Sequence, residues 1–217
     1  MAQRMIHYMI GEMLAQETEL KDKNRFLIGS VIPDAYTDIR YRDVTHFRYF
    51  SEDRKYSCYD IDRFRNTYRN KILQDDLYLG YYMHLVEDVF YRRFIRSDHK
   101  ITVFGYDDKV RILHRDYHVL NRYIRERWHL RYELTIPEDL ENEDIFHIAE
   151  FEIPGFLKAL QDDFSETVEE KTVYVTEEMI DEFMERYYPV IAIEFSHAVT
   201  GDFQLRAADY AWKRLPE

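Results

Sequence analysis

The stretch DDLYLGYYMHLVEDVFYRRFI, residues 75–95, decides the fold. Apolar residues recur at every third and fourth position, and further apolar residues fill the places between them, so a helix over this stretch is apolar almost all round. The residues concerned are Leu79, Tyr82, Met83, Leu85, Val86, Val89 and Phe90. A helix of this kind buries every face and is typical of the middle of a helical bundle.

Helical spacing continues in both directions from this stretch, and only 6 Gly and 5 Pro interrupt the chain, far fewer than an all-β fold would need. The expected helices are 4–15, 61–70, 109–130, 153–164, 176–200 (with Thr176 as N-cap and Gly201 as the stop) and 203–214. An apolar run over 25–32 ends at Pro33. Residues 34–62 are predicted to be a long loop with short turns, and 172–175 a short extended piece. The sequence therefore predicts an all-α, multi-helix bundle.

The length of 217 residues predicts a single helical domain over 1–217. Residues 1–130 would form its core and carry the site described below, and residues 131–217 would supply C-terminal helices that close the bundle. No run approaches the roughly 20 apolar residues of a membrane span.

Charge and cysteine content limit the partners and the location. The net charge of −12 repels polyanions, so no stable nucleic-acid partner is expected. Arginines are nevertheless concentrated in residues 91–96 and 111–131. The single cysteine, Cys58, allows no disulfide within the chain, which predicts a reducing compartment and a cytoplasmic location.

His84 and Asp88 are the central chemical feature of the sequence. A spacing of four places both on one face of the predicted helix, about one turn apart. An imidazole and a carboxylate on a buried face are costly unless they are paired or bind a cation. For this pair alone, a buried His–Asp hydrogen bond is the more common explanation.

Three further residues change that balance. His7 shares an apolar helix stripe, Asp34 follows Pro33 after an apolar run, and His46 lies in the long loop. Separately they read as a core histidine, a helix cap and an ordinary loop residue. Together with His84 and Asp88 they favour a metal site, and mixed imidazole and carboxylate ligands suit Zn, Mn or Fe.

The order of these motifs is similar to that of a known family. The motifs are His7, then GSVIPD at 29–34, THF at 45–47 and YLGYYMHLVED at 78–88. Over roughly residues 4–125 the chain resembles the zinc-dependent phospholipase C family, which is related to the fungal zinc nucleases. The resemblance implies an all-helical fold with up to three zinc ions. It also implies that Asp34, His46, His84 and Asp88 hold one ion, and that Asp88 bridges to a second ion held also by His7.

The family's third ion is held by two histidines and a carboxylate further along the chain. The candidates here are His114, Asp116 and His118, although Asp116 points away from the helix face that the two histidines share. An exposed polar helix face explains these residues about as well as a metal site does.

The resemblance implies a metal-dependent hydrolase of phosphate esters that uses a metal-activated water. Asp34 would act as a ligand or as the residue that orients and deprotonates the water, and the substrate would be a small phosphate ester or a phospholipid. Arg92, Arg93 and Arg96 are either phosphate-clamping or surface residues. The alternative function is a metal-stabilised helical scaffold or binding protein without catalysis. A phosphohydrolase of the His-Asp type is disfavoured, because no His in the chain directly precedes an Asp.

Overall fold

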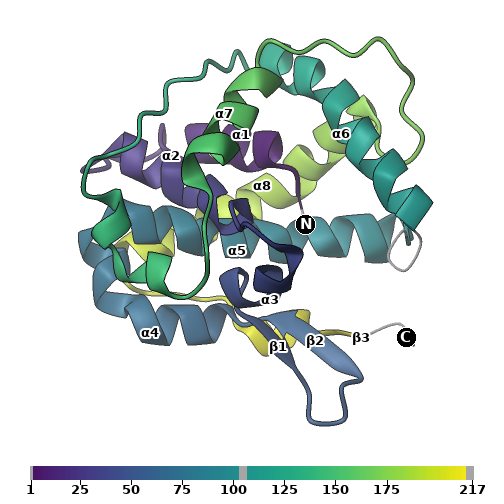
Figure 1. The fold of residues 1–217 in the computed structure, drawn as a ribbon. Helices are drawn as coiled ribbons and strands as arrows, with labels where there is room; N and C mark the ends of the chain where they lie inside the picture. The colour runs from purple at the N-terminus through teal and green to yellow at the C-terminus, as the bar shows by residue number, and fades with distance from the viewer. Residues whose placement is uncertain (1, 103–106, 214–217) are drawn as a thin grey trace.

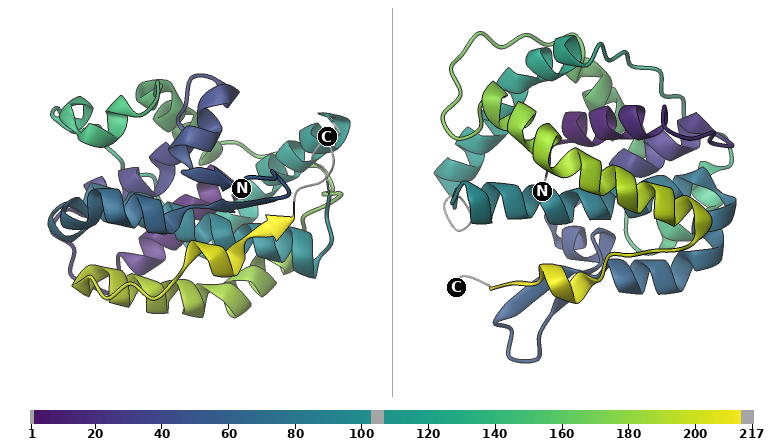
Figure 2. Two further views of the ribbon diagram at one scale, coloured as in Figure 1. Left: turned by 90° about the horizontal axis from the view of Figure 1, so that it is seen from below. Right: turned by 180° about the vertical axis from the view of Figure 1, so that it is seen from behind.

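Helix α5 (Asp76–Arg93) forms the axis of the molecule (Figure 1). The computed structural model describes residues 2–102 and 107–213, and within them α5 is buried from Asp76 to Arg92. Helices α1, α2, α4 and α8 pack around it, and Figure 2 shows α8 crossing behind. The prediction of a central helix, apolar on all sides, is confirmed.

The remaining elements of the described part surround this axis. They are α1 (Arg4–Leu14), α2 (Lys23–Val31), α3 (Arg42–Thr45), α4 (Ile61–Gln74), α6 (Asp107–Arg127), α7 (Ile153–Asp163), α8 (Glu177–Thr200), β1 (Arg48–Phe50), β2 (Tyr56–Tyr59) and β3 (Trp212–Lys213). A π-helical turn, Phe94–Asp98, continues α5. Short 3-10 turns cover Ile32–Asp34, Ile39–Tyr41, Leu140–Asn142, Asp144–His147 and Ala207–Tyr210. The all-α class is confirmed. No helix among the described residues is long and apolar enough to cross a bilayer.

Two glycines let α2 and α5 pack with their backbones in contact. A Cβ added at Gly29 would lie 2.1 Å from the carbonyl oxygen of Leu77, and one at Gly80 would lie 2.0 Å from that of Phe26. Any larger residue would push the helices apart. This close crossing brings the end of α2, and the Ile32–Asp34 turn after it, against α5.

The segment 34–62 is more ordered than the predicted loop. It contains α3 and the antiparallel pair β1–β2, whose register sets Arg48 opposite Tyr59. Strand β3 extends the sheet from the far end of the chain, with Trp212 opposite Ser57. The prediction missed these strands because they are only two to four residues long and the third partner is remote in sequence.

The end of the chain is also different from the prediction. Helix α8 begins after Thr176, whose side chain accepts from the Met179 amide, and ends at Gly201 with φ +78°, as expected. The last helix predicted over 203–214 is wrong for the described residues, and residue 214 lies outside them. Glu194 accepts hydrogen bonds from the amides of Gln204 and Leu205 (both 3.1 Å), which holds this segment extended.

Candidate metal centre

His84 and Asp88 project from one face of α5 toward the N-terminal third of the chain. Both are fully buried. Helix α1 supplies His7, the Ile32–Asp34 turn after α2 supplies Asp34, and His46 follows α3 directly. All five residues predicted from the sequence therefore lie in one cluster.

Each of the three histidines is held through its Nδ1 atom. His84 Nδ1 lies 2.9 Å from the carbonyl oxygen of Ser30, and His46 Nδ1 lies 3.0 Å from that of Arg42. His7 Nδ1 lies 2.6 Å from Oε2 of Glu87. Because a carbonyl only accepts, His84 and His46 donate from Nδ1 and keep the Nε2 lone pair for another partner. Protein metal sites orient histidine ligands in this way.

The Nε2 atoms point at one another and at the carboxylates. His46 Nε2 lies 3.2 Å from His84 Nε2 and 3.2 Å from Asp34 Oδ1. Asp88 Oδ1 lies 3.6 Å from His7 Nε2, and its Oδ2 lies 3.6 Å from His46 Nε2. Zinc bonds of about 2.0–2.1 Å in a tetrahedron separate the ligand atoms by about 3.3 Å. The donor set and its spacing therefore fit zinc.

Two overlapping groups of donors can be distinguished. His7, Asp34 and His84 form one, and His46, His84 and Asp88 form the other; within each group the donor atoms lie within 4.8 Å of one another. Asp88 Oδ1 also accepts the Ala2 amide at 2.8 Å. Two of the buried atoms facing the cluster, His7 Nε2 and Asp88 Oδ2, have no hydrogen-bond partner in the described part of the chain.

Burial and neighbouring charges give most of these groups the protonation state that metal ligands need. Burial would raise the pKa of Asp34, but the hydrogen bond to His46 and the nearby histidines outweigh it and lower the pKa to about 2. Burial and the charge of His7 lower the pKa of His84 to about 3. At neutral pH Asp34 is therefore ionised and His84 is neutral, as metal binding requires.

His7 is the exception. Burial would lower its pKa, but the adjacent carboxylates of Asp88 and Glu87, the latter hydrogen-bonded to Nδ1, raise it to about 10. Glu87 was not among the residues predicted from the sequence, yet it faces the cluster, because a spacing of three also keeps residues on one helix face. That spacing from His84 was the signal that could have identified Glu87.

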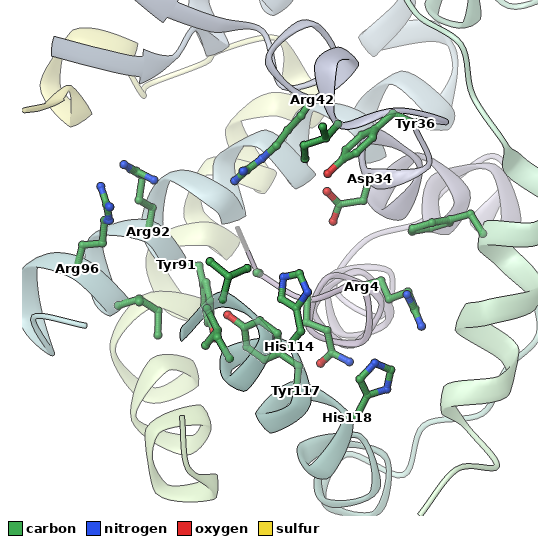
Figure 3. Close-up of a pocket in the computed structure, with 17 residues that line it drawn as sticks. Arg4, Asp34, Tyr36, Arg42, Tyr91, Arg92, Arg96, His114, Tyr117 and His118 are labelled. Carbon is green, nitrogen blue, oxygen red and sulfur yellow. The ribbon is translucent and has the colours of Figure 1, made fainter. Parts of the chain in front are cut away.

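A cavity of about 390 Å³ opens beside the cluster (Figure 3). Asp34 lines it on one side, and His114 of α6 points toward Asp34 from the other. Apolar side chains such as Ile95, Leu113 and Phe156 line other parts of the wall. Of the five clustered residues, Asp34 is therefore the one that faces a pocket of small-ligand size.

A model of the zinc dependent phospholipase C family matches residues 6–194 of the 217. The chain belongs to this family. The match extends well past residue 125, where the motifs recognised in the sequence end. No curated protein and no solved structure matches the chain.

In this family member the three candidates for a third site do not come together. Asp116 is fully buried and its Oδ2 accepts the amides of Val173, Tyr174 and Val175 at 2.5–3.2 Å. His114 lines the pocket, whereas His118 lies 3.0 Å from Glu166. The prediction of a third metal site from Asp116, His114 and His118 is therefore wrong, because the Asp116 carboxylate binds the backbone amides that precede α8.

A different trio, His118, Asp163 and Glu166, has donors close enough for an ion. Arg4 Nε lies 2.6 Å from Asp163 Oδ2, so a guanidinium already neutralises that carboxylate. Glu166 is exposed to solvent. Ordinary ion pairing accounts for the trio.

Some of the tyrosines and arginines near the site are buried in the core, some line the pocket and one is exposed. Tyr81 and Tyr82 are buried and donate to the Thr45 carbonyl and to Glu194, so they contribute to packing and do not line the pocket. Arg92 and Arg96 line the pocket, whereas Arg93 is exposed.

Proposed function

We propose that this protein is a zinc-dependent hydrolase of phosphate diesters that acts as a phospholipase C. In this proposal His7, Asp34, His46, His84 and Asp88 hold two zinc ions, with Asp88 shared between them. The observation that carries the proposal is the common orientation of the three histidines, each fixed at Nδ1 and directed with Nε2 toward the two aspartates. Membership of a zinc-dependent family supports the choice of metal.

Zinc bound by these residues would lower the pKa of water and polarise a phosphoryl oxygen. Asp34 stands where the ligand group meets the pocket, so it can accept a hydrogen bond from the attacking water. A carboxylate with a pKa of about 2 is a weak base at neutral pH, which favours orienting the water over deprotonating it.

His114 is placed to handle the proton that Asp34 is too weak a base to take. Burial, followed by nearby positive charge, lowers its pKa, so the imidazole is neutral at neutral pH. Its ring faces Asp34 across the pocket (Figure 3). We assign His114 the acceptance of the proton that the attacking water loses, which the resulting imidazolium can pass to the departing alcohol oxygen.

The substrate in this proposal is a small phosphate ester or a phospholipid head group. The family supports a lipid substrate, and the apolar wall formed in part by Leu113 and Phe156 suits an amphiphile. The alternative is a metal-stabilised scaffold or binding protein without catalysis. A scaffold alone has no use for a pocket that opens onto the ligand group, and turnover distinguishes the enzyme from a binding protein.

Elemental analysis of the purified protein, run beside an assay with bis(p-nitrophenyl) phosphate, tests the proposal. We expect zinc in the protein and hydrolysis that a chelator abolishes and added zinc restores. His84→Ala should lose both zinc and hydrolysis, whereas the exposed control Arg93→Gln should keep both. Bound zinc without hydrolysis of this diester or of any phospholipid would favour the alternative without catalysis. Failure to bind zinc on titration would disprove the proposed metal centre.

A further inference from the structure

Besides Arg4, which is paired with Asp163, three arginines line the same pocket as Asp34. They are Arg42, which begins α3, and Arg92 and Arg96 at the end of α5 and in the π-helical turn beyond it. Figure 3 shows Arg92 and Arg96 on one side of the opening and Arg42 reaching into it from α3. In a chain of net charge −12, this wall is a local region of positive charge.

The three arginines are close in sequence to the proposed metal ligands and lie on the same helical segments. Arg92 follows Asp88 by four residues and Arg96 follows by eight, so all three belong to one stripe of the helix. The carbonyl of Arg42 accepts from His46 Nδ1 at 3.0 Å. The distance from each guanidinium to the ligand group is therefore set by one or two helical turns.

Arg92 is held in a fixed orientation. Its side chain is 9% exposed, and the guanidinium lies 3.7 Å from the ring centroid of Trp212. Trp212 in turn packs on Tyr59, with ring centroids 5.0 Å apart. Stacking of this kind fixes the plane of a guanidinium, which then offers its N–H groups in one direction.

The positive groups on this wall repel one another. Burial lowers the pKa of Arg92 to about 10; Tyr59 opposes that shift, while Arg96, Arg48 and Arg42 add to it. A bound anion would reduce this repulsion, and arginine forks match the oxygens of phosphate and carboxylate groups. The wall is therefore preorganised for an anion.

The apolar part of the pocket limits what the rest of the ligand can be. A volume of about 390 Å³ accommodates a head group and its phosphodiester, and is at the small end for ligand pockets. Ile39 on the same lining is 66% exposed, which places an apolar side chain where acyl chains would leave the pocket.

We propose that Arg42, Arg92 and Arg96 form a subsite for a second anionic group of the substrate, so that the enzyme selects phosphodiesters whose head group carries a further phosphate. This inference rests on the proposed hydrolase function and names the substrate class of that site. Head groups that carry a cation would meet repulsion from the same wall.

Hydrolysis of two lipids in mixed micelles, a phosphorylated phosphatidylinositol and phosphatidylcholine, tests the subsite. We expect the wild type to prefer the anionic lipid. Arg42→Gln and Arg96→Gln should each lower the ratio of kcat/KM for the anionic lipid to that for phosphatidylcholine about 10- to 100-fold, the value of a charge-assisted hydrogen bond. The exposed neighbour Arg93→Gln should leave the ratio unchanged.

The subsite is overturned if the wild type prefers phosphatidylcholine, or if both variants lose the two activities equally. Arg92→Gln is less decisive, because loss of its packing on Trp212 can unfold the protein. A water-soluble glycerophosphodiester with the same head group, assayed beside the lipid, separates the two sources of this chemistry. A preference for the anionic form in both assays supports the subsite, whereas a preference confined to the lipid assigns it to the micelle surface and overturns the subsite.

Binding separates failure of the subsite from failure of the proposed function. Calorimetry with inositol bisphosphate should show binding to the wild type and to Arg93→Gln, and at least tenfold weaker binding to Arg42→Gln and Arg96→Gln. If this holds while no phosphodiester is hydrolysed, the hydrolase proposal fails and the subsite stands. Equal affinity in all four proteins, or none in the wild type, overturns the subsite whether or not hydrolysis occurs.

Discussion

The buried carboxylate of Glu87 belongs to the metal centre although it is not one of the five donors. Its hydrogen bond of 2.6 Å fixes the ring of His7 and increases the basicity of Nε2. We expect Glu87→Gln to weaken zinc binding about 10- to 100-fold, as substitutions of such supporting residues do. Competition with a chromogenic chelator measures this. The exposed Glu185→Gln is the control, and equal affinity in both variants would contradict the role.

His114 lies in the pocket wall, partly desolvated by its neighbours but still open to solvent, and contributes little to packing. We therefore expect His114→Ala to lower kcat on bis(p-nitrophenyl) phosphate about 100-fold or more, the range for loss of an acid–base group. The melting temperature and the zinc content should hardly change. A parallel loss of stability and activity would show instead that the residue is structural.

The clustering of the five candidate ligands was predictable from the sequence because each is a polar residue in an apolar setting at a motif spacing. Glu87 was missed because only residues four apart, such as His84 and Asp88, were paired, although Glu87 lies three residues from His84 and shares its helix face. Asp116 was misassigned because its true partners, the amides of residues 173–175, lie almost 60 positions away and leave no local pattern.

At the scale of elements, the crossing of α2 and α5 positions the site. A Cβ added at Gly29 or Gly80 would lie 2.1 Å or 2.0 Å from a carbonyl oxygen of the opposing helix. We expect Gly29→Ala or Gly80→Ala to lower the free energy of unfolding by about 1–3 kcal/mol and to weaken zinc binding, because Asp34 would move away from α5. Chemical denaturation measures the loss.

Gly11→Ala provides the comparison for these variants. The nearest atom to its added Cβ is the Ser30 hydroxyl oxygen at 2.8 Å, a side-chain atom that can rotate away. A loss at Gly11 as large as that at Gly29 and Gly80 would contradict the importance of backbone contact.

Asp116 stabilises the connection into α8 rather than a metal ion. Replacing it by Ala would leave three amides without their acceptor, each with a desolvation cost of about 1–3 kcal/mol if it stays dry. We expect Asp116→Ala to lower the melting temperature while the purified folded protein keeps its zinc. Zinc loss at temperatures where the variant remains folded would return Asp116 to the ligand set.

The long helices were predictable because period and capping residues agree, as at Thr176 and Gly201 of α8. The strands and the C-terminal segment were not. Strand β3 depends on β2, and the extended chain at residues 204–205 depends on Glu194, so neither structure is determined by its local sequence.

Considered as a whole molecule, the fold encloses fully buried charged groups at its centre, including Glu87 and Asp88. A cation bound among them compensates these charges in the folded state alone. We expect removal of zinc to lower the free energy of unfolding, by about 4 kcal/mol relative to protein at a thousandfold excess of zinc over Kd. Scanning calorimetry with and without chelator measures the shift, and His84→Ala should show a much smaller one.

The five proposed metal ligands all lie between residues 7 and 88. In polymer terms, an ion held by both ends of that span is a cross-link that closes a loop of about 80 residues, and such a closure removes roughly 4–5 kcal/mol of chain entropy from the unfolded state. This cross-link includes no residue of α6, α7 or α8. With zinc bound, amide hydrogens of the later helices should therefore exchange through partial unfolding in which residues 7–88 stay folded. Unfolding would then begin in the C-terminal half of the molecule.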